Sequence, residues 1–555
     1  MVALWVAYKY NRKLIETVPV GVYLFILLSY LLAVSGHISH ITGLLLLFEA
    51  AGLLLTAYQL ALRKREFIMP FKDPGNAVFA VMLVIMWVLS LHMRVTNFDD
   101  FHSWAITPKD MFYVNGLPTG GMASTFYRDY FPTVYVIDFL ALRLIGEYRE
   151  SIMFFVLWTL MLVSLSPFLH RNSEDGIMLY ICRVAAGMML PFLMSFQFLH
   201  SLGLDILATT VFGSALVYIM CKDRRGGMDG YEYIRIVLAV TILGMLKTTS
   251  LILAFVCIGM YFVRFFEVKN RSFWLRTVFL FAASTGFWLS WKIFCRIKGN
   301  TTYLSDNLEK NLSSGHAGLP DYAASTIKDF TARLFTYGLN DGRTGLSSIM
   351  ILMLFVISFI IYMRRNGRKT EDRLTFAVIL LGMAGYLLVM LYVYLFVFEE
   401  WEAVSLSSYD RYIATYFGAM LYLSLFLMLA KEIKPVWTAP VLLLLLVFTI
   451  NFEYVGKTLI PSGYEAEYGE LVSEIDSIEE EFMQGAGERP VYGESILIVD
   501  DRADQLRAKV LPYAAVPGVT RLLLPSEGGK IPGETEIAEA AAEYNARVID
   551  LRRNR

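Results

Sequence analysis

The sequence predicts an all-α polytopic membrane protein, with a small α/β unit at its C-terminal end. Of 555 residues, 56% are hydrophobic and only 18% are charged, whereas about 25% are charged in a typical soluble domain. The mean hydropathy of +0.52 means that a water-soluble fold would expose a large apolar surface. Strands alternate with helices only after about residue 453. The net charge of −1 argues against a nucleic-acid partner, which normally requires a basic face.

Apolar runs long enough to form membrane spans occupy most of the chain. A bilayer core about 30 Å thick requires about 20 residues of helix. Two of the runs are short and almost meet at Lys247, so one or both are expected to be broken or tilted. About 13 spans are predicted, at 15–35, 41–62, 76–94, 151–169, 177–197, 203–221, 232–247, 249–266, 274–295, 346–363, 374–398, 411–430 and 436–452.

Lysine and arginine in the short loops predict the orientation, because cytoplasmic loops carry an excess of both. The turns at 36–40 and 198–202 contain neither residue, whereas the alternate loops are basic. The N-terminus is therefore expected in the cytoplasm and the C-terminal tail outside it, in a multi-pass protein of the cell membrane. The basic groups are Arg63, Lys64 and Arg65; Lys222, Arg224 and Arg225; Lys269 and Arg271; Arg364, Arg365, Arg368 and Lys369; and Lys431 and Lys434.

The spans divide the chain into six parts. They are N-terminal transmembrane helices (1–94), an outer loop with interfacial helices (95–150), a transmembrane core (151–295), a second outer loop (296–345), C-terminal transmembrane helices (346–452) and an extracytoplasmic α/β tail (453–555).

The tail is expected to begin with an acidic amphipathic helix at 466–483, followed by strands at 495–501, 520–525 and 546–551. Helices between these strands favour a parallel sheet. Asp500 and Asp501 end the first strand, where they mark either a ligand crevice or a solvated strand end. We favour the solvated strand end.

The first outer loop begins NFDDFHSW, which places Asp99, Asp100, His102 and Trp104 together at the membrane surface. Neighbouring carboxylates repel, so that one keeps its proton more readily while the other stays ionised. An ionised carboxylate can take a proton from a sugar hydroxyl or hold a divalent cation. A solvated loop with an interfacial tryptophan is the alternative. These eight residues do not decide between the two.

Residues 105–150 contain apolar stretches too short to span, with Arg128 and Tyr130 in an aromatic turn that ends in proline. They are expected to form helices that lie in the membrane interface.

Four further polar residues are predicted at the outer ends of spans: Asp205, Lys247, Arg411 and Tyr412. Asp205 is either a site residue or an N-cap. The alternative for both cations is snorkelling from helix ends. We favour a functional role for Lys247 and Arg411, because the positive-inside bias makes cations less expected on the outer side.

In this order, the features resemble the GT-C superfamily of glycosyltransferases, and most of all its bacterial polyprenyl-monosaccharide branch. The resemblance covers about 95–430. Two departures are that three spans precede the acidic loop, where one is commoner, and that no WWDYG-type signature follows the last span. The segments that carry the resemblance are Asp99-Asp100, the Tyr130-Phe131-Pro132 turn, HSLGLD (200–205), GMLKT (244–248), Trp291-Lys292 and SYDRY (408–412).

The resemblance implies an enzyme that transfers a sugar from a polyprenyl-phosphate-linked donor to a cell-envelope glycan or lipid-linked acceptor, by inverting displacement on the outer face. Asp99 or Asp100 would act as the base, while Lys247 and Arg411 hold the phosphate. A divalent cation, Mg²⁺ or Mn²⁺, at Asp99 and Asp100 is left open, because some members of the superfamily use one and others do not. Membrane lipids are further partners. The remaining substrate-binding candidates are His102, Trp104, Arg128, Tyr130, Asp205 and Tyr412.

Two other functions fit the composition. A transporter or flippase of lipid-linked glycans should show an internal repeat and ionisable residues within its spans. We find no repeat, and charges within the predicted spans are few. A scaffold that binds partners through its tail is the other function.

Two outer segments also have alternative roles. The 296–345 loop, with His316 and Asp321, either orders over bound substrate or is an inert connector. The acidic run of Glu399, Glu400 and Glu402 around Trp401 either binds the acceptor or is a solvated loop, and we favour the solvated loop.

Overall fold

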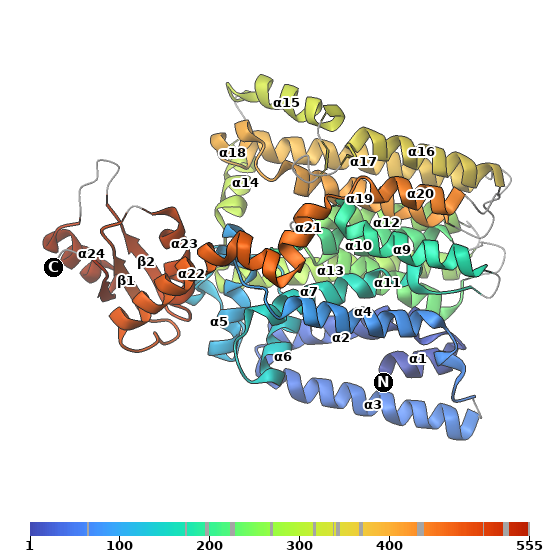
Figure 1. The fold of residues 1–555 in the computed structure, drawn as a ribbon, viewed down its shortest axis with the longest axis horizontal. Helices are drawn as coiled ribbons and strands as arrows, with labels where there is room; N and C mark the ends of the chain where they lie inside the picture. The colour runs from blue at the N-terminus through green and yellow to red at the C-terminus, as the bar shows by residue number, and fades with distance from the viewer. Residues whose placement is uncertain are drawn as a thin grey trace.

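Long helices that run side by side form a bundle, and the C-terminal tail extends from one end of it (Figure 1). We call this the tail-side end. The computed structural model describes residues 1–63, 66–172, 175–194, 199–221, 228–266, 270–314, 318–336, 338–339, 345–365, 370–429, 438–502, 504–525 and 532–552.

Every predicted span corresponds to a helix. These are α2 (Leu14–Val34), α3 (Ile41–Arg63), α4 (Pro74–Ser90), α7 (Glu150–Ser164) continued by α8 (Ser166–Leu169), α9 (Ile177–Met194), α10 (Asp205–Met220), α11 (Gly230–Gly244), α12 (Ser250–Phe265), α13 (Arg271–Lys298), α16 (Ser348–Arg365), α17 (Thr370–Phe396), α19 (Tyr409–Met428) and α20 (Thr438–Val447).

Among the described residues, seven helices are long and apolar enough to cross a membrane. An eighth is added if α20 and α21 (Phe452–Leu459), which are bent by 71° at a short break, form one span. The protein is therefore a multi-pass membrane protein, and the count of thirteen spans stays a prediction. Several of the remaining helices, such as α10 and α11, have only 15 or 16 residues, fewer than the about 20 that a span needs.

The bundle has a buried centre and an apolar outside. All of α10 is buried, and it packs closely against α19. Gly213 permits this approach, because a Cβ atom there would lie 2.4 Å from the Tyr422 ring. By contrast, α3 and α17 expose leucines such as Leu47, Leu54 and Leu381. Lipid can solvate such a surface, since all backbone groups of a helix are satisfied internally.

A layer of short helices covers the tail-side end of the bundle. The segment 95–150, predicted as the first outer loop, forms a single turn of wide π-helix, η3 (Asp100–Trp104), followed by α5 (Ile106–Val114), the turn η4 (Gly120–Met122) and α6 (Tyr135–Ile145). The second outer loop contains α14 (Tyr303–Ser314) and α15 (Ala323–Thr336), and His316 lies outside the described residues. The acidic run forms the short helix α18 (Glu400–Ser405), in which Trp401 is exposed.

Three short elements remain in the N-terminal part. The helix α1 (Val2–Tyr10), which is not among the predicted elements, packs against α2 and α3, and Thr17 donates a hydrogen bond to the carbonyl of Ala3 at 2.8 Å. The turns η1 (Ile38–His40) and η2 (Met69–Phe71) flank α3.

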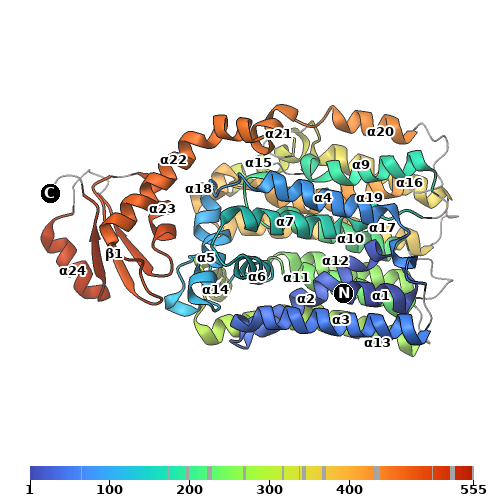
Figure 2. The same cartoon turned by 60° about the horizontal axis from the view of Figure 1, so that its bottom comes forward.

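The tail is a helix followed by a small α/β unit. The long helix α22 (Pro461–Ala486) leads from the bundle to a three-stranded sheet (Figure 2). The strands β1 (Ser495–Val499), β2 (Val519–Leu523) and β3 (Arg547–Asp550) are parallel, in the order β2-β1-β3, with Ser495 opposite Val519. The helices α23 (Gln505–Ala514) and α24 (Glu534–Tyr544) make the crossovers, as parallel neighbours require.

One expectation for the tail is wrong. Asp500 is not a solvated strand end, because its side chain is fully buried. It accepts hydrogen bonds from Arg502 and Arg507, each at 2.7 Å. A buried carboxylate is stable only when it is paired, and these two arginines supply the pairing.

Candidate active site

Asp100 supports the first outer loop from within. Its side chain is fully buried and accepts hydrogen bonds from the amide of Leu202 and the hydroxyl of Ser201, at 3.1 Å each. Burial raises the pKa of Asp100 well above its ordinary value and the charge of Asp99 adds to this, although the Leu202 amide opposes it. Asp100 therefore ties the loop to the segment before α10 and does not face the solvent.

Asp99, by contrast, is open to solvent on one side. Its side chain is 48% exposed, and it accepts a hydrogen bond from Arg411 at 2.6 Å. Burial opposes the ionisation of Asp99. The charge and hydrogen bond of Arg411, helped by the charge of Lys509, outweigh burial and lower its pKa below the ordinary value. Asp99 is therefore an accessible carboxylate that stays ionised.

Two enclosed cations meet at the ends of three helices beside Asp99. Arg411 lies in the first turn of α19, and its Nε is 3.2 Å from a carboxylate oxygen of Asp205, the first residue of α10. Lys247, in the turn between α11 and α12, donates a hydrogen bond to the same carboxylate. The Tyr412 ring lies 5.1 Å from the Lys247 ammonium, and its hydroxyl accepts from Arg411 at 3.4 Å.

For three of these residues, the arrangement does not match the structural alternative of an N-cap or of snorkelling. Asp205 is the first residue within α10, and the N-cap position is occupied by Leu204. The side chains of Lys247 and Arg411 are each only 13% exposed, whereas a snorkelling side chain keeps its charged end in water. We call Asp99, Asp205, Lys247, Arg411 and Tyr412 the tail-side cluster.

Lys292 is a third cation near this cluster. Its ammonium lies 3.3 Å from both the Asp129 carboxylate and the hydroxyl of Thr248, the residue after Lys247. Trp291 donates a hydrogen bond to the Asp129 carbonyl at 2.8 Å. Lys292 lies at the end of a predicted span but is not among the site residues predicted from the sequence. Its position at a predicted outer helix end was the available signal.

The aromatic candidates are packed into the loop. Trp104 is 4% exposed and lies 5.1 Å from the Tyr130 ring. His102 packs against Phe126 at 5.2 Å. Burial lowers the pKa of His102 to about 4, with a contribution from the positive charge of Lys509, so that this imidazole is neutral at neutral pH.

Arg128 lies apart from the other predicted cations. Its described hydrogen bond is to the carbonyl of Thr125 at 3.3 Å. Burial and the positive charge of Arg521, on the tail strand β2, lower the pKa of Arg128. These observations do not place it with Lys247 and Arg411.

The tail also contributes a cation. Lys509, on α23, lies 4.0 Å over the Phe98 ring, and its charge lowers the pKa of both Asp99 and His102. No sequence signal pointed to Lys509, because it lies about 410 residues after Asp99 and is brought there by the docking of the tail.

The two aspartates do not fit a divalent cation in this arrangement. Asp99 faces the Arg411 guanidinium and Asp100 faces a backbone amide, and both of these are hydrogen-bond donors. Within the part of the chain that the structure describes, no three His, Cys, Asp or Glu side chains come together as a metal site. We derive no step through a metal.

A helical bundle with an apolar outside and a polar cluster at one end defines a multi-pass membrane protein with a candidate active site at that end. No family model and no curated protein matches the chain. Among solved structures, ArnT from Cupriavidus metallidurans bound to undecaprenyl phosphate is similar over 86% of this chain and 90% of its own, with a TM-score of 0.45 and 12% identity. Likeness at this level assigns neither a function nor a residue.

Proposed function

We propose that the protein is a membrane glycosyltransferase of the GT-C type. It transfers a sugar from a polyprenyl-phosphate-linked donor to a cell-envelope glycan or lipid-linked acceptor, on the extracytoplasmic face. The observation that carries this proposal is the tail-side cluster, in which Asp99 stays ionised and open beside the enclosed cations Arg411 and Lys247. A solvent-accessible carboxylate can accept a proton, and enclosed cations beside it can stabilise a leaving anion.

The position of the cluster suits a lipid-linked donor. Such a donor carries its phosphate at the headgroup level and its tail among the lipids. Arg411 and Lys247 lie at helix ends and can bind a phosphate by charge-assisted hydrogen bonds. In this proposal the phosphate replaces Asp99 as the partner of Arg411. Because Arg411 lowers the pKa of Asp99, its release makes the carboxylate a stronger base when the donor is bound.

The reaction is a single displacement. Asp99 takes the proton of the acceptor hydroxyl, whose oxygen forms a bond to the anomeric carbon on the face opposite the phosphate. The bond from that carbon to the phosphate oxygen breaks, and its electron pair leaves with the polyprenyl phosphate. Lys247 and Arg411 neutralise the charge of the leaving group. The anomeric configuration is inverted, and no covalent enzyme intermediate forms.

Asp99 is the base in this scheme, and Asp100 is a positioning residue. Both were candidates from the sequence, but the hydrogen bonds to Leu202 and Ser201 occupy Asp100 within the protein. An Asp100→Asn change therefore acts on the position of the loop, while an Asp99→Asn change acts on proton transfer.

The test uses purified protein in nanodiscs, a polyprenyl-phosphate hexose or pentose as donor and a cell-envelope extract as acceptor. The wild type should release polyprenyl phosphate and invert the sugar, as NMR of the product shows. Arg411→Gln and Lys247→Gln should raise the KM for the donor. Glu488→Gln, which removes a highly exposed acid of the tail, is the control. Movement of the intact donor across the bilayer without its consumption would contradict the proposal and favour a flippase.

A further inference from the structure

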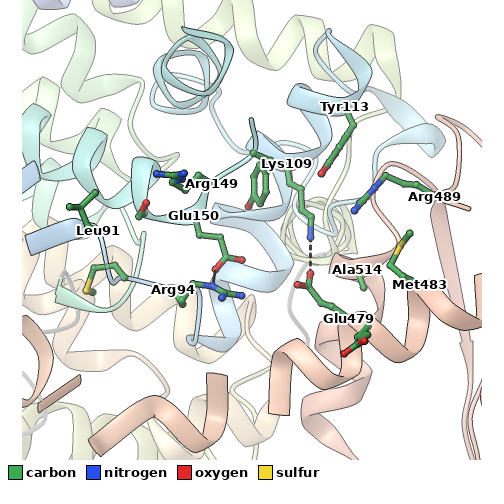
Figure 3. Close-up of a pocket in the computed structure, with 14 residues that line it drawn as sticks. Leu91, Arg94, Lys109, Tyr113, Arg149, Glu150, Glu479, Met483, Arg489 and Ala514 are labelled. Atoms are coloured by element: carbon green, nitrogen blue, oxygen red, sulfur yellow. Dashed lines mark hydrogen bonds and ion pairs between the residues drawn. The ribbon is translucent and has the colours of Figure 1, made fainter. Parts of the chain in front are cut away.

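A polar groove of about 640 Å³ lies between the tail and the layer that covers the bundle (Figure 3). We propose that this groove binds an uncharged or at most singly anionic saccharide chain, the part of the acceptor remote from the reacting hydroxyl. This proposal rests on the function proposed above. The residues that carry the argument are Arg94, Lys109, Tyr113, Glu150, Glu479 and Arg489.

Matched ion pairs form the floor of the groove. Lys109, on α5, is nearly buried and lies 2.9 Å from Glu479 on α22. Arg94 lies 2.8 Å from Glu150, which also accepts a hydrogen bond from Tyr513 at 2.7 Å. Burial opposes the ionisation of Glu479, but the charge of Lys109 outweighs it and lowers the pKa of Glu479. The floor therefore offers fixed donors and acceptors with little net charge.

Aromatic rings stand beside this floor. Tyr113 and Tyr148 have ring centroids 6.3 Å apart, and the Arg489 guanidinium lies 4.4 Å over the Tyr113 ring. Figure 3 shows Tyr113 and Arg489 next to the Lys109–Glu479 pair. Arg489 also donates a hydrogen bond to the carbonyl of Val516 at 3.1 Å. Its planar guanidinium carries five N–H groups, and the rings offer apolar faces.

A saccharide fits this combination better than a phosphate does. Sugar rings present C–H faces that pack on aromatic rings, and hydroxyls that both donate to carboxylates and accept from guanidinium groups. A multiply charged phosphate needs cations in clear excess. The lining has four cations (Arg94, Lys109, Arg149 and Arg489) and three acids (Glu150, Glu479 and Glu480), only one cation in excess. The volume lies within the usual range of about 300–1,000 Å³ for ligand pockets.

Helix α23 connects the groove to the segment that contains Asp99. Tyr513 donates to Glu150 of the groove, and four residues earlier on α23 Lys509 lies 4.0 Å over the ring of Phe98, the residue before Asp99. This separation is about 6 Å along a helix. The Tyr513 ring also packs against Phe101 at 5.2 Å, next to the two aspartates. A chain held in the groove therefore lies beside the turn of α23 that reaches the proposed base.

The test measures saccharide binding to the full chain in nanodiscs without donor. The probes are unbranched hexasaccharides of glucose, mannose, galactose and N-acetylglucosamine, with hexagalacturonate and inorganic phosphate as anionic probes. At least one neutral hexasaccharide should bind, and Tyr113→Ala and Arg489→Met should each weaken its binding by about tenfold. Arg143→Met, which removes an exposed arginine of α6 outside the groove, should leave the affinity unchanged. Thermal unfolding checks that each variant is folded.

Three results would overturn the proposal: no neutral hexasaccharide binds, both variants bind as tightly as the wild type, or phosphate and hexagalacturonate bind in preference. The Asp99→Asn variant separates the two proposals, because it should bind the hexasaccharide normally. If the wild type consumes no polyprenyl-linked donor while the groove still binds the hexasaccharide, the proposed function fails and the groove stands.

Discussion

Two buried ion pairs at the end of the bundle away from the tail are built differently from the tail-side cluster. Away from the tail, Arg183 pairs with Asp175 at 2.6 Å and Arg264 with Asp372 at 2.9 Å. The side chains of these pairs are almost entirely buried. At the tail-side end, Arg411 is shared between Asp99 and Asp205, and Asp99 is 48% exposed.

The difference separates a scaffold from a site. A buried pair is out of reach of a ligand, and loss of one partner leaves an unpaired charge in an apolar interior. A shared cation beside an exposed acid can exchange one of its partners for a substrate. Variants of these two buried pairs should therefore lose stability, and variants of the tail-side cluster should lose activity.

The largest effect on stability is expected for Arg264→Met. It leaves the Asp372 carboxylate buried without its ion-pair partner, and such a change costs about 3–5 kcal/mol. Lys247→Met is the matched change at the tail-side end and should cost less, since Asp205 keeps Arg411. The free energy of unfolding in nanodiscs measures both. Equal losses of unfolding free energy in Arg264→Met and Lys247→Met would contradict the distinction between the buried pairs and the tail-side cluster.

The second largest effect on stability is expected for a buried acid in the layer of short helices over the bundle. Asp110, on α5, is fully buried and accepts a hydrogen bond from the Ser124 amide at 2.9 Å. Burial raises its pKa to about 7. The unfolded chain releases this proton near pH 4, so that stability falls as the pH rises from about 4 to about 7 and is then constant.

Asp110→Asn removes this pH dependence. The variant should be more stable than the wild type at pH 8, by on the order of 2–4 kcal/mol, and should show no such gain below pH 4. Thermal unfolding across this pH range measures the gain. Asp321→Asn, at an exposed position, should show no pH-dependent gain. A gain for Asp110→Asn that is independent of pH would contradict the assignment.

The smallest effect concerns the cation from the tail. Because Lys509 lowers the pKa of Asp99 and His102, Lys509→Gln should raise both. The acid limb of the pH–rate profile for sugar transfer should therefore move to higher pH. A partly screened charge contributes about 0.2–1 kcal/mol, which corresponds to an about 1.4- to fivefold lower rate at a pH on the acid limb. Lys457→Gln, a more exposed lysine of α21, is the control, and an unchanged acid limb would count against a role for the tail.

The helices and their order could be predicted because apolar runs have few alternatives in a chain of this composition. The tail-side cluster could also be predicted in part. Asp99, Lys247 and Arg411 all lie at the ends of predicted spans. Because successive spans cross the membrane in alternate directions, these three ends are predicted on the same side, although no single motif is specific. The strands of the tail follow from apolar runs that alternate with short helical segments.

The rest depended on contacts between distant segments. Asp99 and Asp100 are equivalent in the sequence, and only the packing of the 199–204 segment buries one and leaves the other open. Lys509 and the groove arise from docking of the tail, which no local pattern encodes. The number of spans is not fixed by hydropathy either, since short helices such as α10 are enclosed by their neighbours.

The most direct test compares Asp99→Asn with Asp372→Asn in sugar transfer per folded molecule. Asp99→Asn should stay folded and lose about 100- to 10,000-fold in rate, the usual range for a general base. Asp372→Asn removes an acid of the opposite end, so it should be less stable but retain the wild-type rate per folded molecule. Transfer by Asp99→Asn at the wild-type rate would contradict the assignment of the tail-side cluster as the active site.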